Sequence, residues 1–282
     1  MLLGINMLLW TTHVSEDHLH LCEDLKRLGY DGIELPVFSG TPEAYAKIGA
    51  GLADIGLRVT AVGVLPDVSR DVSSPDARIR AAGLDHIKWM IDCVAAARGE
   101  VLCGPFYQPL GVFGDQPPTE AEFGNVVDVH RAAMDYAAVR SINLAVEPLN
   151  RFECNLLNTV DRAVELVRAV DQRGYGILYD TFHLNIEEKR PVEAISKAIA
   201  SINHVHLSEN DRGTPGKGHI PWTETLAAFK RHGYDGWYVI EAFGRAMPEI
   251  AATTRVWRDL SGSLDEVSHF GHDFLRATYE AA

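Results

Sequence analysis

Apolar positions along the chain gather in short unbroken runs, and longer stretches with the period of an amphipathic helix separate them. Continuous apolar runs are typical of strands that are buried on both faces of a parallel sheet. Eight such runs predict strands at residues 2–10, 32–37, 57–64, 100–103, 143–149, 175–180, 202–207 and 236–242. Eight strand–helix pairs within 282 residues predict an α/β fold, a (β/α)8 TIM barrel that forms one domain over residues 1–282. A doubly wound parallel sheet is the alternative.

Capping residues mark the ends of several predicted helices. Ser15 precedes a helix that Gly29 closes, and Thr41-Pro42-Glu43 combines a capping hydroxyl, a proline at the first position and an acid. The helical period continues in five further segments, at residues 75–98, 119–141, 159–171, 192–200 and 222–232. Helices after the last strand close the chain.

The charge balance narrows the range of partners. Lysine and arginine number 26 and acidic residues 39, which gives a net charge of −13. A chain of this charge is poorly suited to bind a nucleic-acid backbone, because such binding needs clustered cations. No apolar run approaches the roughly 18 residues that span a bilayer, so we expect no membrane partner. Residues 1–10 read as a strand rather than a signal peptide, because a basic flank and a cleavage site are missing.

The cysteines give no sign of a metal or redox motif. Cys22, Cys93, Cys103 and Cys154 lie far apart and form no CxxC pair. We expect reduced, buried thiols in a cytoplasmic protein.

Ionisable residues interrupt the apolar runs of the last four predicted strands near their carboxyl ends. They are Glu147, Asp180, His206 and Glu241. The carboxyl ends of barrel strands meet at one face, where active sites form. Like charges converge there only if a cation holds them, since an unpaired buried charge costs several kcal/mol. Three carboxylates and one imidazole suit Mn²⁺, Mg²⁺ or Co²⁺ better than a structural zinc ion.

Each of these residues taken alone also has a purely structural interpretation. Glu147 can cap the turn that begins at Pro148, and Asp180 can be the N-cap of a helix. His206 can be a hydrogen-bonded core histidine, as we expect for His204, and Glu241 can pair with an arginine such as Arg245. A purely structural interpretation of all four residues at once is much less plausible than of any one alone. The glycine-rich segment 213–218 is not a phosphate-binding loop of the Walker type, because it lacks the strand–loop–helix context and the Gly-Lys-Ser/Thr ending.

Four motifs of the second half resemble those of a known family. They are Glu147-Pro-Leu-Asn-Arg-Phe-Glu153, Asp180-Thr-Phe-His183, His206-Leu-Ser-Glu-Asn-Asp-Arg212 with Pro215-Gly-Lys-Gly218, and Ile240-Glu241. The sequence is similar to the ketose 3-epimerases, among them D-tagatose 3-epimerase and D-allulose (D-psicose) 3-epimerase. These enzymes belong to the xylose isomerase-like sugar isomerase and epimerase barrels. The resemblance covers essentially the whole chain, although the first half carries less specific motifs.

The resemblance implies a function and a set of site residues. Glu147, Asp180, His206 and Glu241 would bind one divalent metal ion, typically Mn²⁺, and Glu147 and Glu241 would also act as the catalytic acid and base. Glu153, His183 and Arg212 match positions that contact the substrate. We further assign Trp10, Glu34, Phe106 and Tyr107 to the substrate pocket, although core packing explains each equally well. The family also implies a homodimer or homotetramer and a free ketohexose as the small-molecule substrate.

The chemistry of 3-epimerisation is consistent with such a site. A proton next to the C2 carbonyl is removed from C3 and returned from the other face through an enediolate. A cation on O2 and O3 would stabilise that charge, and two carboxyl groups on opposite sides of C3 would exchange the proton.

Three alternatives remain open from the sequence. An aldose–ketose isomerase or a hydroxypyruvate-type isomerase would use the same barrel and metal for a reaction at C1 and C2. An endonuclease IV-like phosphodiesterase would need several metal ions and more histidines at the strand ends. A barrel that only binds a ligand would not need both candidate bases.

Overall fold

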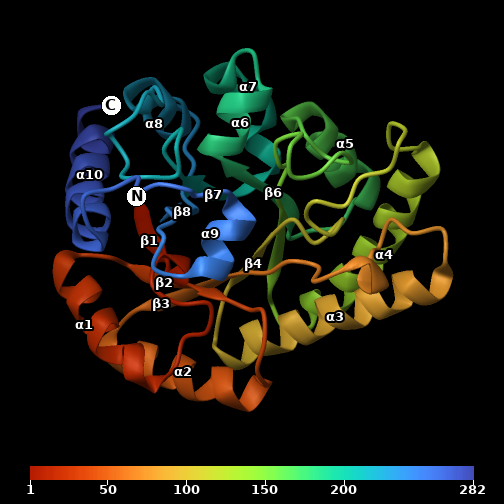
Figure 1. The fold of residues 1–282 in the computed structure, drawn as a ribbon, viewed down its shortest axis with the longest axis horizontal. Helices are drawn as coiled ribbons and strands as arrows, with labels where there is room; N and C mark the ends of the chain where they lie inside the picture. Colours follow the sequence, from red (N-terminus) through yellow and green to blue (C-terminus); the bar gives the residue numbers. More distant parts are fainter.

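The computed structural model describes residues 1–282 and has eight parallel strands closed into a barrel in chain order. Figure 1 shows the strands at the centre and the helices around them. The strands are β1 (Leu2–Asn6), β2 (Gly32–Pro36), β3 (Arg58–Val62), β4 (Val101–Gly104), β5 (Asn143–Val146), β6 (Tyr175–Asp180), β7 (Ile202–Leu207) and β8 (Trp237–Ile240). The predicted (β/α)8 barrel is therefore confirmed, and the doubly wound sheet is excluded.

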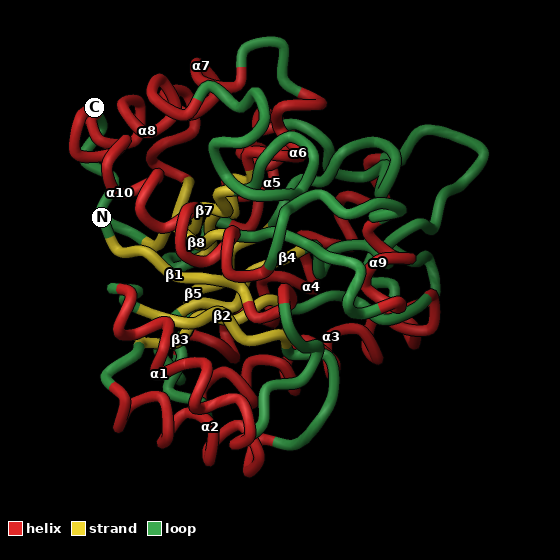
Figure 2. The backbone as a smooth tube through the Cα atoms, turned by 60° about the vertical axis from the view of Figure 1, so that its left-hand side comes forward, coloured by secondary structure: helices red, strands yellow, loops and turns green.

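The helices that follow the strands form the outer layer of the barrel (Figure 2). They are α1 (Leu19–Leu28), α2 (Pro42–Ile55), α3 (Ala77–Ala96), α4 (Glu120–Ala138), α5 (Val160–Val170), α6 (Thr181–Glu187), α7 (Pro191–Ala198), α8 (Trp222–Arg231), α9 (Pro248–Thr254) and α10 (Gly271–Ala281). A short π-helical segment, Glu266–Phe270, leads into α10. None of the helices has both the length and the apolar character needed to cross a membrane.

The predicted capping residues act at the start of α2 and the end of α1. The Thr41 hydroxyl accepts a hydrogen bond from the Ala44 N–H, and Pro42 is the first helical residue. Gly29 closes α1 with a φ of +106°, a left-handed conformation that glycine adopts without steric cost. Ser15 precedes a 3-10 turn, Glu16–His18, so the helix itself begins later than predicted.

Closure of the barrel requires backbones to approach closely between β3 and β4. Gly104 ends β4 with a φ of +126°, and a Cβ atom there would lie 2.2 Å from the Gly63 carbonyl oxygen. Any other residue at position 104 would push these two strand ends apart. The glycine therefore sets the path of the chain at the face of the barrel where the strands end.

The sequence pattern misplaced some element ends. The first strand ends at Asn6 rather than at residue 10, because the Asn6 side chain accepts a hydrogen bond from the Leu8 N–H and starts a 3-10 turn. The strand predicted at 143–149 ends at Val146. No helix was assigned directly after Asp180, where α6 begins. All four cysteines are buried and unpaired, as predicted.

A buried histidine of α4 forms hydrogen bonds to the barrel. His130 is fully buried, its Nδ1 atom accepts a hydrogen bond from the Tyr175 hydroxyl, and its Nε2–H donates to the Phe106 carbonyl. Burial lowers the pKa of His130 from 6.5 to about 4, although the Phe106 carbonyl raises it slightly. The fold therefore holds His130 in its neutral form.

This histidine makes the stability of the fold sensitive to acid. The unfolded chain takes up the proton near pH 6.5 and the folded chain only near pH 4, so acid favours unfolding between these values. We expect His130 to reduce the free energy of unfolding by up to about 3 kcal/mol as the pH falls through this window. Urea denaturation of the wild type and of His130→Asn at several pH values measures the difference. Tyr175→Phe is the control, because it keeps the imidazole and should keep the acid sensitivity. Equal pH dependence of the wild type and His130→Asn would contradict the assignment.

Candidate functional site

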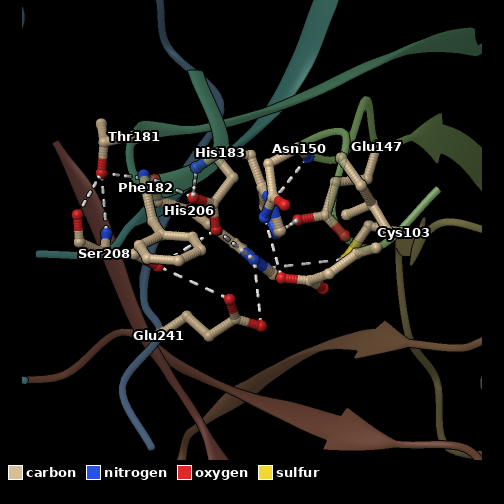
Figure 3. Close-up of polar contacts among 12 residues, drawn as sticks. Cys103, Glu147, Asn150, Thr181, Phe182, His183, His206, Ser208 and Glu241 are labelled. Carbon is tan, nitrogen blue, oxygen red and sulfur yellow. Dashed lines mark hydrogen bonds and ion pairs between the residues drawn. The ribbon is translucent and has the colours of Figure 1, made fainter. Parts of the chain in front are cut away.

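The four ionisable residues at the strand ends converge at the base of a cavity. Glu147 directly follows β5, Asp180 ends β6, His206 lies in β7, and Glu241 directly follows β8. Each is at most 4% exposed, and their ligand atoms all lie within 4.8 Å of one another. Figure 3 shows the side chains of Glu147, His206 and Glu241 in this region. The structure therefore brings together the four residues that the sequence singled out.

Asp180 acts both as a helix cap and as a member of this cluster. Its Oδ1 atom accepts hydrogen bonds from the N–H groups of Phe182 and His183 at the start of α6. Its Oδ2 atom accepts from the Ser208 hydroxyl at 3.0 Å and from Arg212 at 3.1 Å. Burial by itself raises the pKa of Asp180, but the charge of Arg212 and the contact with His206 outweigh it and hold the pKa far below its ordinary value. Asp180 is therefore ionised in the folded protein.

Glu147 has the opposite electrostatic environment. Burial, and then the nearby charges of Glu241 and Asp180, raise the pKa of Glu147 well above its ordinary value. A cation placed among these carboxylates would reverse part of this effect. The cluster thus holds carboxyl groups in both forms, with Glu147 protonated and Asp180 ionised.

His206 offers the strongest indication that the cluster suits a cation. Its Nε2 atom lies 2.7 Å from Glu34 Oε1, whereas its buried Nδ1 atom has no hydrogen-bond partner. That Nδ1 atom lies 3.3 Å from Glu241 Oε1 and 3.6 Å from Asp180 Oδ2. Burial by itself lowers the pKa of His206, but the charges of Glu34 and Glu241 outweigh it and raise the pKa. A proton on Nδ1 therefore offsets the two carboxylates, and a cation bound to the Nδ1 lone pair would take its place. Three carboxylates and one imidazole nitrogen thus fit a hard divalent cation.

Glu34 lies below the cluster and not in the pocket to which the sequence assigned it. It is fully buried, and its carboxylate joins His206 to His204, whose Nε2 atom is 2.7 Å from Glu34 Oε2. Asn6 Nδ2 and the Thr60 hydroxyl also donate to it, at 2.9 and 3.0 Å. Burial raises the pKa of Glu34, but the two histidines outweigh this and lower it. Glu34 therefore orients the imidazole of His206, and His204 is a hydrogen-bonded core histidine, as predicted.

This arrangement predicts the effect of Glu34→Gln. An amide in place of the carboxylate turns one hydrogen-bond acceptor into a donor, so it cannot hold both imidazoles in their present orientation. We expect the affinity for a divalent cation to fall by about 10- to 100-fold. Calorimetric titration of metal-free protein with Mn²⁺ measures this change. Cys103→Ala is a matched control from the same buried group of side chains, because Cys103 Sγ makes only long contacts, at 3.4 Å to Glu34 Oε2 and 3.7 Å to His206 Nε2. Equal affinities of wild type and Glu34→Gln would exclude this role for Glu34.

Glu153, His183 and Arg212 line the cavity beside the cluster. Arg212 Nη2 lies 2.6 Å from His183 Nε2, and the second guanidinium nitrogen binds Asp180. Burial and the charge of Arg212 lower the pKa of His183, so this imidazole is neutral. Burial raises the pKa of Glu153, and the positive charge of Arg212 opposes the rise. The three residues present polar atoms along one wall above the carboxylates.

Asn150 connects two of these residues and was not assigned a role from the sequence. Its Nδ2 atom donates to Glu153 Oε1 at 2.8 Å and to His183 Nδ1 at 2.9 Å, and its backbone N–H also faces His183 Nδ1. The amide orientation follows from Oδ1, which accepts from the Phe152 N–H. His183 Nδ1 is therefore an acceptor. Asn150 belongs to the quoted motif between Glu147 and Glu153, which was the signal available in the sequence.

Three aromatic residues assigned to the pocket lie elsewhere. Phe106 packs against His130 in the core, and the Tyr107 hydroxyl contacts Cys154 Sγ and the Leu157 carbonyl. Trp10 follows the 3-10 turn and packs against the core from outside the cavity. The cavity is lined instead by their neighbours in the chain, Leu8, Thr12 and Pro105. All three residues follow their strands in turns, where the alternation of strand faces does not apply.

The cavity above the cluster has a volume of about 490 Å³. Apolar side chains from the loops after β1, β2, β3 and β8 and from α9 form much of its wall; they include Leu8, Phe38, Val62, Leu65, Phe243 and Ile250. Its ionisable lining consists of Glu147, Glu153, Glu241, Glu249, His183 and Arg212. The single arginine is bound to Asp180 and Glu241, and no lysine lines the cavity. The cavity is therefore suited to a neutral polar ligand rather than to a phosphate ester.

Comparison with known proteins identifies the family. The sequence profile of the xylose isomerase-like TIM barrel family matches residues 22–266. A probable ketose 3-epimerase of Synechocystis sp. is 31% identical over 280 residues, which cover 98% of this chain and 96% of the relative. The chain belongs to the ketose 3-epimerases of this barrel family. Members of the family are isomerases that act on carbohydrates.

Solved structures of the ketose 3-epimerase family have the same fold over the full length of the chain. The D-allulose 3-epimerase from Methylomonas sp., in complex with D-allulose, matches with a TM-score of 0.91 and 28% identity, and the match covers 99% of this chain and 97% of the other. The D-psicose 3-epimerase from Clostridium cellulolyticum, with D-tagatose, also matches with a TM-score of 0.91, at 27% identity and 99% coverage of both chains. Both solved structures thus contain a ketose.

Proposed function

We propose that this chain is a metal-dependent 3-epimerase of free ketohexoses, which interconverts D-fructose with D-allulose and D-tagatose with D-sorbose. The observation that carries the proposal is the pair of buried carboxyl groups, Glu147 and Glu241, within one four-residue cluster at the base of the cavity. The family and the two ketose-containing neighbours support the substrate class. A homodimer or homotetramer in the cytoplasm stays a prediction.

The cluster suits the charge that develops when C3 loses a proton. Glu147, Asp180, His206 and Glu241 would hold a divalent cation, with Mn²⁺ as our first choice and Mg²⁺ or Co²⁺ as alternatives. When bound, such a cation supplies a Lewis acid that stabilises negative charge on the sugar oxygens at C2 and C3. The unpartnered Nδ1 atom of His206 is the feature of this chain that fits the cation best.

The two glutamates would divide the proton transfer between them. One glutamate, as the carboxylate, takes the proton from one face of C3, and the other, as the acid, returns a proton to the opposite face. Burial and like charges favour the protonated form of Glu147, so a carboxylic acid is available near neutral pH. In the reverse direction the two residues exchange roles.

The polar wall would orient the sugar. Neutral His183 and the Arg212 guanidinium are placed to donate hydrogen bonds to oxygens near C2, and Glu153 can accept from a hydroxyl. Apolar side chains on the other walls would exclude water from the reacting carbon. The acidic lining supports a free sugar over a sugar phosphate.

Isotope exchange tests this function. The protein with Mn²⁺ is incubated in D₂O with D-fructose or D-tagatose, and NMR follows the position of the label. We expect deuterium at C3 together with D-allulose or D-sorbose, and no reaction in a control treated with a chelator. Deuterium at C1, or an aldose product, would replace the proposal with the aldose–ketose isomerase alternative. Absence of exchange with both sugars would overturn it.

A further inference from the structure

A buried carboxylate outside the cavity organises the loop that carries Arg212. Glu209 is fully buried, lies three residues after His206, and is not part of the cavity lining. Its Oε2 atom accepts hydrogen bonds at 2.8 Å from the Gly216 N–H and from Trp222 Nε1. Its Oε1 atom accepts at 3.0 Å from the N–H groups of Asn210 and Ile220. Four donors thus replace the water that an exposed carboxylate would bind.

The loop between β7 and α8 wraps closely around this carboxylate. The donors come from its start, its middle and the first residue of α8, Trp222, so Glu209 ties together segments up to 13 residues apart. At Gly218 a Cβ atom would lie 2.5 Å from Glu209 Oε1. The glycine-rich segment 213–218, which is not a Walker-type loop, thus allows the backbone to approach the carboxylate.

Arg212 depends on this loop for its orientation. Its backbone is left-handed, with a φ of +67°, a conformation that an arginine adopts only where its surroundings impose it. Its N–H bonds to the Glu209 carbonyl at 3.0 Å, and its own carbonyl accepts from the Phe243 N–H at 2.9 Å. The guanidinium then reaches His183, Asp180 and Glu241 at the cavity.

We propose that Glu209 is a positioning residue for the epimerase reaction. By fixing the loop from within, it holds the Arg212 guanidinium against the reacting end of the sugar, although it touches neither the sugar nor the four-residue cluster. This inference rests on the proposed function. It adds a residue that affects turnover only by fixing the position of Arg212.

A double-mutant cycle with Arg212 tests the proposal. In Glu209→Gln the amide group faces two N–H donors, so the loop loosens. We expect kcat/KM for D-fructose to fall about 10- to 100-fold, since a displacement of about 1 Å is enough for such a loss. In an Arg212→Lys background the same substitution should cost less than about threefold, because the two residues act as one unit. Losses that add up fully in the double variant would overturn the proposal.

Two further variants separate positioning from general loosening of the loop. Trp222→Phe keeps a smaller aromatic ring but removes the indole N–H that donates to Glu209, and we expect a smaller loss of kcat/KM in the same direction, about threefold. Glu266→Gln is the matched control, because Glu266 ties the same loop through the Thr214 hydroxyl at 2.9 Å but lies away from the cavity. It should change kcat/KM less than about twofold. A loss in Glu266→Gln equal to that in Glu209→Gln would contradict a specific role for Glu209.

Hydrogen exchange distinguishes failure of this inference from failure of the proposed function. Amide exchange over residues 209–222 needs no substrate, and we expect it to accelerate in Glu209→Gln while the barrel strands stay protected. A wild type without 3-epimerase activity would refute the function, and exchange would then decide alone whether Glu209 holds the loop. Unchanged exchange in Glu209→Gln would refute the positioning role, whatever the activity.

Discussion

Replacing either Glu147 or Glu241 by Gln is expected to lower kcat for ketose epimerisation by at least about a thousandfold. Each substitution removes a proton-transferring carboxyl but keeps a side-chain oxygen in the cluster and nearly the same volume. Coupled assays or NMR with D-fructose and D-allulose measure the loss in both directions. Two bases on opposite faces also predict that residual deuterium exchange at C3 is confined to one epimer in each variant, and to a different epimer in each.

Glu249→Gln is the matched control for this experiment. Glu249 lines the same cavity from α9 but does not belong to the four-residue cluster, so kcat should stay within a few-fold of the wild type. Circular dichroism and metal content establish that the inactive variants are folded and loaded. Substantial turnover by Glu147→Gln or Glu241→Gln would exclude that residue as an acid or base.

Removal of divalent cations is expected to reduce epimerisation to the uncatalysed background, and Mn²⁺ should restore it. The physical reason is that stabilisation of charge on the sugar oxygens by a bound cation amounts to several kcal/mol. A cation that binds only the folded chain also stabilises it, by about 2.7 kcal/mol at a concentration one hundred times Kd. Thermal unfolding should therefore shift upward by several degrees when Mn²⁺ is added to the metal-free protein.

The variant Asp180→Asn tests whether the cation binds at the four-residue cluster. Asparagine keeps a side-chain oxygen for the N–H groups of Phe182 and His183 at the start of α6, but it loses the charge that faces the cluster. We expect this variant to fold, to lose activity and to show little shift of Tm with Mn²⁺. Full activity of a wild-type sample shown to be free of metal would contradict metal dependence. An equal Tm shift in Asp180→Asn would place the cation elsewhere.

In the second half of the chain, the local sequence was enough to predict which residues meet at the end of the barrel. A carboxylate or an imidazole within an apolar strand has few explanations, and parallel strands bring their carboxyl ends to one face. Asp180 shows that two interpretations can hold together, because it caps α6 and also faces the cluster. Glu241 does pair with an arginine, but the partner is Arg212 rather than Arg245, which pairs with Asp259.

For the first half of the chain, the sequence did not predict which side chains line the cavity, because that depends on where each strand ends and which way each side chain points. Successive residues of a strand point to opposite faces, so an error of a few residues at its end reverses the assignment of the side chains that follow. Trp10 and Phe106 lie in turns beyond the ends of β1 and β4, where this alternation no longer predicts which way a side chain points, and Leu8 and Pro105 line the cavity instead. Glu34 points into the barrel as expected, but at a depth where it meets histidines and not the cavity.

The sequence by itself determined the barrel, the family and the four ionisable residues at the strand ends, because periodicity, capping and residue type are local properties of the chain. Only the tertiary structure decided what each polar group faces. It placed Glu34 against His206, left the Nδ1 atom of that histidine without a partner, and closed a loop around Glu209. These relations join residues that are distant in sequence, and their energies depend on distance and burial, which no sequence pattern records.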